Sequence, residues 1–458
     1  MIILVSDIHM TDGTAGAINI PASAFTGTFT DMGRLACEAG ANDVTLVYLG
    51  DIFDLIRTAL WQNYPMADRP WGDQSLKPVV DSSGQVLLPK SEAAAFEILN
   101  KVIEKSPDAF DIMGKDLTEF GFPPNTKRVY VPGNHDRLCN MYPRLRERVC
   151  DVLRLQHNPA QPFPHFFADT EHRSFARHGH EWDVYNFEAQ SIFNGTEWFV
   201  PLDSDYSETP IGDVIAAEIA SLLPKLVLDR LPGLDPKVKN VLQRRLMDMF
   251  DVRPMAGMIP YLAYQVRDFN DPTITNAVNS GAREVVERFN SMDFVNRWIH
   301  KHSAFLDPMS DGEKIKLLIR TLELITVTAI QPLLQAADKL AGFFPGDNFR
   351  GKAGEEFQRL DSARSPYKDA MLYVLYGHTH DPDTEAISVL GKGESQAGRV
   401  YLNTGMWRPS HSVGLTDGYV SWKNLTYSVI YHPNENASRQ GKAGFPAFET
   451  WTGHLKVD

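Results

Sequence analysis

Short apolar runs alternate with longer stretches of mixed polarity over the first 150 residues. The runs Ile2–Val5, Val44–Leu49 and Arg128–Val131 have the length and composition of buried strands. Near Asp31–Ala39 and Ser91–Lys105, apolar residues recur at three- and four-residue spacing, which predicts helices. The intervening segments Trp61–Pro89 and Pro107–Thr126 are rich in Pro, Gly, Asp and Asn, and they predict loops near strand ends. This alternation is typical of a layered α/β fold.

The pattern changes between about Tyr185 and Asp369, where helical spacing replaces the strand-like runs. Four stretches show it: Ile211–Leu231, Pro236–Phe250, Thr275–Phe289 and Gly312–Leu340. Strand-like runs return at Met371–Tyr376, Arg399–Asn403 and Tyr419–Val429, and the tail after Tyr431 has the composition of a loop. We therefore expect an α/β domain made of residues 1–184 and 371–458, interrupted by a helical insertion at 185–370.

The composition is that of an ordinary globular protein, with 43% hydrophobic and 22% charged residues among 458. Asp and Glu number 58 against 45 Lys and Arg, so the net formal charge is −13 and nothing indicates a nucleic-acid partner. Only Cys37, Cys139 and Cys150 occur, which is typical of a reducing compartment. Because no 18 consecutive residues are apolar and the N-terminus has no signal-peptide pattern, we expect no transmembrane segment and a cytoplasmic location.

Five polar clusters, each built from His, Asp, Asn or Gly, follow predicted strands. In chain order they are Asp7-Ile-His9, Gly50-Asp51-Ile-Phe-Asp54, Gly133-Asn134-His135-Asp136, His178-Gly-His180 and Gly377-His378-Thr-His380. In extended backbone, side chains two residues apart point the same way, so the first and last clusters can each present two ligands to one metal region. The glycines remove Cβ atoms where the backbone must come close. The clusters therefore predict a metal centre at the strand ends.

The order and content of these clusters resemble the calcineurin-like metallophosphoesterase superfamily. Its motifs are D-x-H, G-D-x-x-D, G-N-H-[DE], a single His beside Gly, and G-H-x-H, and all five are present in order. The resemblance covers about residues 1–184 and 371–458, and it implies a two-sheet αββα sandwich. A more distant resemblance to UDP-2,3-diacylglucosamine pyrophosphatases breaks at His180, where that branch has Asp.

Carried over position by position, the resemblance implies two divalent metal ions. One would be held by Asp7, His9, Asp51 and His380, and the other by Asp51, Asn134, His178 and His378. Asp51 would bridge them, because a carboxylate has two oxygens. Imidazole, carboxylate and amide donors suit first-row ions, with Mn²⁺ expected first and Fe or Zn also compatible. Two divalent cations, two carboxylates and a bridging hydroxide leave a formal charge of about +1, which attracts a phosphate ester.

The implied activity is hydrolysis of a small-molecule phosphoric ester by the metal-bridging hydroxide. In the family pattern His135 is not a ligand, and it would protonate the leaving group as a general acid, which favours phosphodiesters. Asp54 and Asp136 would orient imidazoles or waters, or cap the helices that follow them. Arg137 and Arg408 would bind a phosphate oxygen or form ordinary salt bridges.

Alternatives remain for one ligand and for the activity. His178 and His180 both fit the fourth motif; His178 is preferred because it directly follows a predicted strand, and His180 would then face the substrate or the cap.

The other activities are a phosphomonoesterase or pyrophosphatase acting on a nucleotide- or lipid-linked substrate, a nuclease, and a non-catalytic scaffold. The acidic charge argues against the nuclease, and the complete ligand set argues against the scaffold. The insertion leaves and rejoins the α/β domain beside predicted ligands, so we expect it to cap the site.

Overall fold

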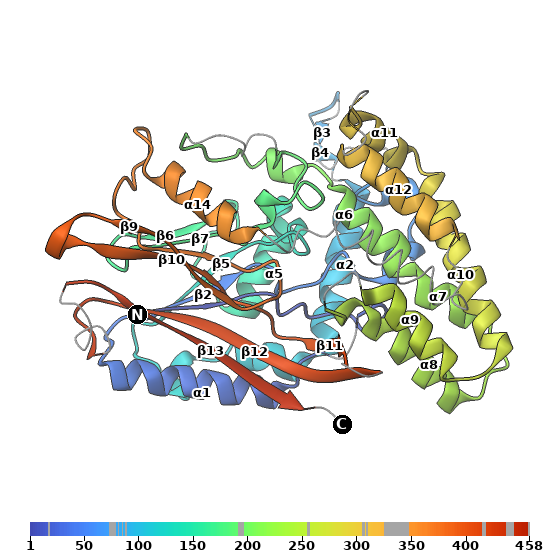
Figure 1. The fold of residues 1–458 in the computed structure, drawn as a ribbon, viewed down its shortest axis with the longest axis horizontal. Coiled ribbons are helices and arrows are strands. Elements are labelled where there is room, and N and C mark those ends of the chain that lie inside the picture. Colours follow the sequence, from blue (N-terminus) through green and yellow to red (C-terminus); the bar gives the residue numbers. More distant parts are fainter. Residues whose placement is uncertain are drawn as a thin grey trace.

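A six-stranded sheet built around three parallel strands carries the N-terminus of the protein (Figure 1). In the computed structural model its strands are, in spatial order, β11 (Pro409–Val413), β12 (Tyr419–Tyr431), β1 (Ile2–Val5), β2 (Thr45–Leu49) and β5 (Lys127–Val131), with β13 (Ala447–Lys456) also paired to β12. β1, β2 and β5 run parallel, whereas β12 is antiparallel to β1, with Ile2 opposite Ile430. Both ends of the chain therefore contribute to one sheet.

A second sheet has five strands and joins the segments on either side of the insertion. Its spatial order is β6 (Phe167–Asp169), β7 (Ser174–Ala176), β8 (Tyr373–Tyr376), β10 (Ala397–Asn403) and β9 (Asp383–Leu390). β7 and β8 are parallel neighbours, with Ser174 opposite Tyr373, although nearly 200 residues separate them in the sequence. A separate two-stranded hairpin consists of β3 (Val79–Val80) and β4 (Val86–Leu87).

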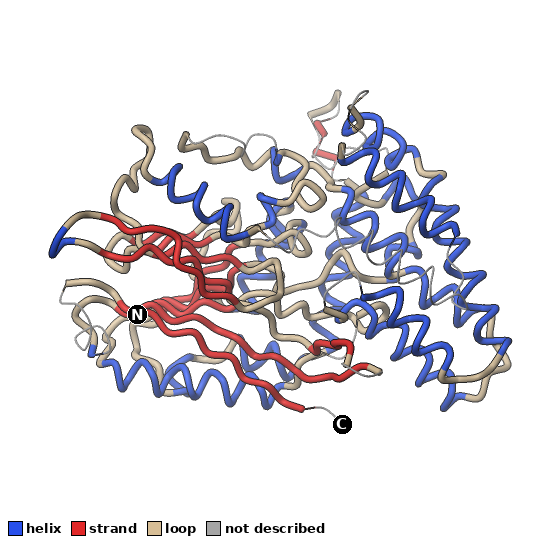
Figure 2. The backbone as a smooth tube through the Cα atoms, viewed as in Figure 1, coloured by secondary structure: helices blue, strands red, loops and turns tan. Residues whose placement is uncertain are grey.

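The two sheets pack face to face, and helices cover both outer faces (Figures 1 and 2). Helices on the first sheet's side are α1 (Ala22–Ala39), α2 (Lys90–Lys105), α3 (Pro107–Met113), α4 (Leu138–Met141) and α5 (Pro143–Leu153). α14 (Phe349–Leu360) lies on the second sheet, where Phe357 packs in one cluster with Val374. Ile2 and Leu4 belong to the core between the sheets, whereas Ile3 and Val5 belong to the core under α1. Burial on both faces explains the continuous apolar run of β1.

The structure describes residues 1–456 except 17–18, 73–78, 81, 85, 88, 191–196, 254–256, 305–306, 308–309, 325–347, 415–417 and 437–443. Within these residues the predicted mixed α/β fold with two sheets is confirmed. None of the described helices is long and apolar enough to cross a membrane.

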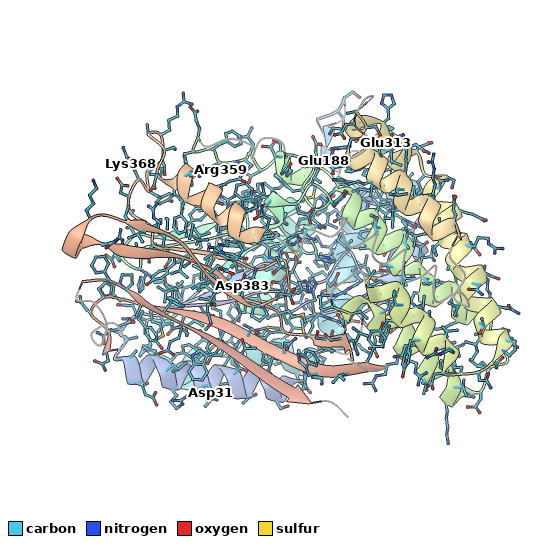
Figure 3. The ribbon with its side chains drawn as sticks, in the orientation of Figure 1. Asp31, Glu188, Glu313, Arg359, Lys368 and Asp383 are labelled. Carbon is cyan, nitrogen blue, oxygen red and sulfur yellow. The ribbon has the colours of Figure 1, made fainter. Side chains whose placement is uncertain are left out.

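The middle third of the chain is helical and lies at one end of the two sheets (Figure 1). Its helices are α6 (Ile211–Val214), α7 (Leu222–Asp229), α8 (Pro236–Asp248), α9 (Met258–Arg267), α10 (Pro272–Asn290), α11 (Asp293–His302) and α12 (Asp311–Leu324), with a π-helical turn at Ile215–Ala220. Asp235 and Asp271 cap α8 and α10, and each precedes a proline at the first helical position. The start of the insertion is tied to α11 through Glu188, labelled in Figure 3, which accepts hydrogen bonds from Trp298 Nε1 (2.7 Å) and Lys301 Nζ (2.6 Å).

Several element boundaries differ from the sequence prediction. The predicted loop 107–126 contains α3, a seven-residue helix that begins with Pro107 at its first turn. The tail after Tyr431 was expected to be a loop, but β13 pairs with β12 from Tyr431 to Trp422. α1 begins at Ala22 rather than near Asp31, because Phe25 and Phe29 extend its buried face by two turns. The end of the predicted helix Gly312–Leu340 lies outside the described residues.

Candidate metal centre

The five polar clusters meet beyond the carboxyl ends of strands from both sheets. Asp7 and His9 follow β1, Asp51 follows β2, and Asn134 and His135 follow β5; from the second sheet, His178 follows β7 and His378 and His380 follow β8. Parallel strands bring their carboxyl ends to one edge, and the two packed sheets bring the two edges together. Helices α6 to α12 of the insertion lie at this end of the sheets (Figure 1).

The first predicted ligand set converges on one point. One donor atom each from Asp7, His9, Asp51 and His380 lies within 4.8 Å of the others. His380 Nε2 is 3.3 Å from Asp7 Oδ1 and 3.0 Å from His9 Nε2. Asp7, His9 and Asp51 are at most 1% exposed. Two carboxylates and two imidazoles in a buried, four-donor arrangement fit a divalent ion with nitrogen and oxygen preference.

The second predicted set shares Asp51 with the first. Asp51 Oδ2 lies 3.2 Å from His178 Nε2 and 3.5 Å from His9 Nε2, so one carboxylate oxygen faces a histidine of each set. His378 Nδ1 lies 3.1 Å from Asn134 Oδ1. His178 donates its Nδ1 proton to the carbonyl of Leu49 (2.8 Å), and its buried Nε2 is directed toward the Asp51 carboxylate. With Nδ1 fixed by a backbone carbonyl, Nε2 is the nitrogen that faces Asp51 and that could bind a metal ion in place of its proton.

Left-handed backbone conformations are concentrated at these ligands. Nine non-glycine residues in the described part of the chain have positive φ, and five of them are predicted ligands: Asp7 (51°), His9 (47°), Asp51 (54°), His378 (68°) and His380 (66°). Each such residue costs on the order of 1 kcal/mol. Tertiary hydrogen bonds maintain the conformation, for example from His9 N to Asp51 O (2.8 Å). Strain that recurs at one cluster of polar residues indicates a functional site.

Two motif glycines allow the close approach of the strand-end loops. A Cβ atom at Gly50, whose φ is +86°, would collide with the His178 ring, and one at Gly133 would collide with the Asp51 carboxylate. Glycine is therefore required at both positions for steric reasons, as the sequence pattern predicted.

Burial and neighbouring charges shift the pKa values of the ionisable groups at the site. Burial opposes ionisation, but nearby histidines, above all His178, hold the pKa of Asp7 and Asp51 well below the usual range. Burial also opposes protonation of His178, yet Asp51 and Asp7 raise the pKa of His178 to about 10. In His380, burial and the nearby Arg253 lower the pKa to about 3. The two carboxylates thus stay ionised and attract positive charge into the site.

Asp54 holds two histidines in place. Its Oδ2 lies 3.2 Å from His9 Nδ1, its Oδ1 lies 2.9 Å from His135 Nδ1, and Arg57 pairs with the same carboxylate at 2.9 Å. Burial tends to lower the pKa of His135, but Asp54 and Asp51 raise it to about 9. Asp54 also accepts a hydrogen bond from Arg57 N (2.9 Å), but no α-helix begins there in the described residues, so the carboxylate closes a turn and orients imidazoles.

Asp136 stabilises the loops around the site instead of contacting an imidazole. Its side chain accepts hydrogen bonds from Ile52 N (2.8 Å) and Gly133 N (2.6 Å), which join the loops after β2 and β5. It does not cap α4, whose first residues have no side-chain cap. Burial and the nearby Asp51 raise the pKa of Asp136 to about 6.

His180 lies between the predicted ligand His178, with ring centroids 5.4 Å apart, and residues of the insertion. Its ring lies beside Phe187 and Tyr206, with centroid distances of 5.8 and 6.0 Å. Burial lowers the pKa of His180 to about 3. Of the two candidate histidines, His178 lies next to Asp51, and His180 faces the residues that would form the cap.

Arg137 and Arg408 form buried ion pairs with carboxylates of the insertion. Arg137 Nη2 lies 2.8 Å from Asp213, and Arg408 contacts both oxygens of Asp251 at 2.9 Å. Arg408 also donates to the carbonyl of His9 (2.7 Å). Both guanidinium groups therefore join the insertion to the α/β domain, which is the salt-bridge alternative of the sequence analysis.

Sequence reasoning missed three residues at the site. Asp183 Oδ2 lies 3.2 Å from His378 Nε2, Asn186 accepts a hydrogen bond from Asn134 Nδ2 (3.2 Å), and Arg253 Nη2 donates to His380 Nδ1. Asp183 lies three residues after His180 in the sequence, and this short distance from the fourth motif could have marked it as a site residue. Asn186 and Arg253 belong to the insertion, where no local pattern marks them.

Comparison of the chain with protein-family models, with curated proteins and with solved structures finds no match.

Proposed function

We propose that the protein is a dinuclear metal-dependent hydrolase of phosphoric esters, of the calcineurin-like metallophosphoesterase type, with phosphodiesters as preferred substrates. The observation that carries the proposal is the shared Asp51 oxygen, which faces His9 of one ligand set and His178 of the other. The helix–sheet–sheet–helix layering and the order of the five clusters around the site agree with the same assignment.

The donor types suit divalent ions with nitrogen and oxygen preference; the first set converges as a group, and the second is supported by pairwise contacts. Asp7, His9, Asp51 and His380 would hold one ion, and Asp51, Asn134, His178 and His378 would hold the other. No cysteine lies among these donors, which favours Mn²⁺, Fe or Zn over ions that need thiolates. When bound, such a pair supplies an acidified water and a positive centre for the phosphate.

His135 is the group proposed to protonate the leaving group. It follows the ligand Asn134, its side chain is 20% exposed, and Asp54 fixes its Nδ1, which leaves Nε2 for the substrate side. The Asp54 and Asp51 carboxylates favour the protonated ring, so His135 carries a transferable proton near neutral pH. A general acid is most useful for an alkoxide leaving group, which is the reason for preferring diesters.

The proposal is tested by reconstituting the purified protein with Mn²⁺ and measuring hydrolysis of bis(p-nitrophenyl) phosphate, p-nitrophenyl phosphate and linear duplex DNA. We expect metal-dependent turnover of the diester above the monoester, and no cleavage of DNA. Asp51→Asn should lose bound metal and at least about a hundredfold in activity. Asp31→Asn on exposed α1 is the matched control and should behave as wild type. Unchanged activity in Asp51→Asn, or no metal-dependent ester hydrolysis by the wild type, would reject the proposal.

A further inference from the structure

A short segment of the insertion, Asp251–Arg253, is held against the predicted metal centre. Asp251 is paired through both oxygens with Arg408, which in turn donates to the carbonyl of His9. Arg253 N donates to the carbonyl of His411 on β11 (2.9 Å), and Val252 forms a bridge with the same residue. The segment is therefore anchored on both sides, and the position of the Arg253 side chain is set by the α/β domain.

Three arginines surround this end of the site, and two of them have carboxylate partners. Arg57 pairs with Asp54, and Arg408 pairs with Asp251. Arg253 is partly buried and forms no ion pair with any residue that the structure describes. Its Nη1 donates to the carbonyls of Phe250 (3.1 Å) and Val252 (2.9 Å), and its Nη2 donates to His380 Nδ1. The carboxylates of Asp251 and Asp381 act on Arg253 electrostatically, but neither forms an ion pair with it. A desolvated guanidinium group with no directly paired carboxylate, beside the predicted metal site, is suited to an anionic ligand.

The contact with His380 cannot persist in a metal-loaded site. A guanidinium group has only donors, so His380 accepts at Nδ1 and carries its proton on Nε2. Nε2 is the atom that faces Asp7 and His9. A neutral imidazole that gives Nε2 to a metal carries its proton on Nδ1, and two donors would then meet. Arg253 must therefore turn to another acceptor when the site is filled.

We propose that Arg253 is the substrate-binding residue contributed by the insertion, and that it binds a non-bridging phosphate oxygen of the ester at the metal centre. The planar fork of a guanidinium group matches two phosphate oxygens. This inference rests on the proposed function, because it places the phosphate at the Asp7, His9, Asp51 and His380 end of the site. The contact between Arg253 and the phosphate oxygen would make the insertion part of the active site.

The test compares Arg253→Met, Arg253→Lys and the control Arg267→Met, an exposed arginine of α9. Each Mn²⁺-loaded variant is titrated with inorganic phosphate by calorimetry, and KM and kcat are measured with bis(p-nitrophenyl) phosphate. Arg253→Met should weaken phosphate binding and raise KM by about tenfold or more, as expected for one lost charged hydrogen-bonding partner. Arg253→Lys should recover part of the affinity, and Arg267→Met should match wild type.

Two further measurements separate a binding role from a structural one. Because Arg253→Met removes a positive charge beside the cation site, its Mn²⁺ affinity should equal or exceed that of wild type. Its thermal midpoint should stay within about 2 °C of wild type, since no carboxylate loses its partner. Equal phosphate affinity in Arg253→Met and wild type would overturn the inference while leaving the proposed function intact. If the wild type takes up no metal, the proposed function fails. The same phosphate titration is then made on the metal-free proteins. Weaker phosphate binding by Arg253→Met than by wild type supports the inference, and equal phosphate binding overturns it.

Discussion

The two oxygens of the Asp54 carboxylate contact two histidines that have different expected roles. Oδ2 faces His9, a predicted ligand, and Oδ1 faces His135, the predicted general acid. Arg57 neutralises part of the charge. A carboxylate that fixes the Nδ1 side of an imidazole determines the tautomer and leaves Nε2 free for a metal or a substrate. The spacing of Asp54 within its motif predicted this role, but the turn with Arg57 N showed that it does not start a helix.

His135→Ala tests the general-acid role. The variant should keep its metal but lose more activity toward a diester with an alkyl leaving group than toward bis(p-nitrophenyl) phosphate, because p-nitrophenolate needs little protonation. The loss should be about 10²- to 10⁴-fold for the alkyl ester. The measurement is kcat/KM for both esters, with His300→Ala on α11 as the control. An equal loss for both esters would assign His135 to phosphate binding instead.

Asp248 on α8 provides a test by pH, away from the predicted ligands. Burial and the neighbouring Asp251 raise the pKa of Asp248 from 3.8 to about 7. Between these two pH values the folded protein retains a proton that the unfolded chain has released, so this group lowers stability as the pH rises. Asp248→Asn should therefore raise the melting temperature at pH 8, by about 2–4 °C, and change it little at pH 4. A decrease at pH 8, or the same shift at both pH values, would contradict the assigned pKa; Asp31→Asn is the control.

At the scale of elements, a short connector makes one of the contacts between the insertion and the α/β domain. Asp251 lies in the 3-10 turn Met249–Asp251 that follows α8, and it is fully buried against Arg408. Hydrophobic periodicity predicted the helices on either side, because each has one apolar face. It carries no information about a connector, and the pairing of Asp251 with a residue 157 positions away has no local pattern.

Arg408→Met should be strongly destabilising, because it leaves the Asp251 carboxylate buried without its partner. The expected loss is about 3–5 kcal/mol in the free energy of unfolding, measured by denaturant titration. Arg364→Met is the matched control: its pair with Glu197 has a similar distance of 2.9 Å, but the side chains are 75% and 70% exposed. That variant should change stability by less than about 1 kcal/mol. Equal effects of the two substitutions would show that Arg408 does not anchor the insertion.

Strand prediction succeeded for the buried runs of β1 and β2 and for β5 at one sheet edge, but it missed β9 and β13 at other edges. β1 and β2 are continuous apolar runs because both faces are covered. β9 and β13 lie at edges of their sheets. The residues of β9, Asp383–Leu390, are exposed or half-exposed, and its polar residues give this sequence the composition of a loop. Whether such a segment forms a strand depends on the neighbouring strand, and the local sequence does not show which strand that is.

At the scale of the whole molecule, the insertion and the α/β domain share one hydrophobic core. Trp61 and Trp71 of the α/β domain belong to the same buried cluster as Leu223 and Val278 of the insertion. The convergence of the five motifs could be predicted because each is local and follows a strand. The contacts that Asn186 and Arg253 make could not, since they join residues far apart in the sequence. The sequence therefore predicts which motif residues come together more fully than it predicts the residues that surround them.

The most direct test of the central claim is an anomalous difference map from crystals of the Mn²⁺-loaded protein, collected above the manganese absorption edge. The account predicts two peaks that share the Asp51 carboxylate. One should lie among Asp7, His9 and His380, and the other among Asn134, His178 and His378, with His180 bound to neither. A single peak, two peaks that do not share Asp51, or no peak at these residues would contradict the dinuclear centre.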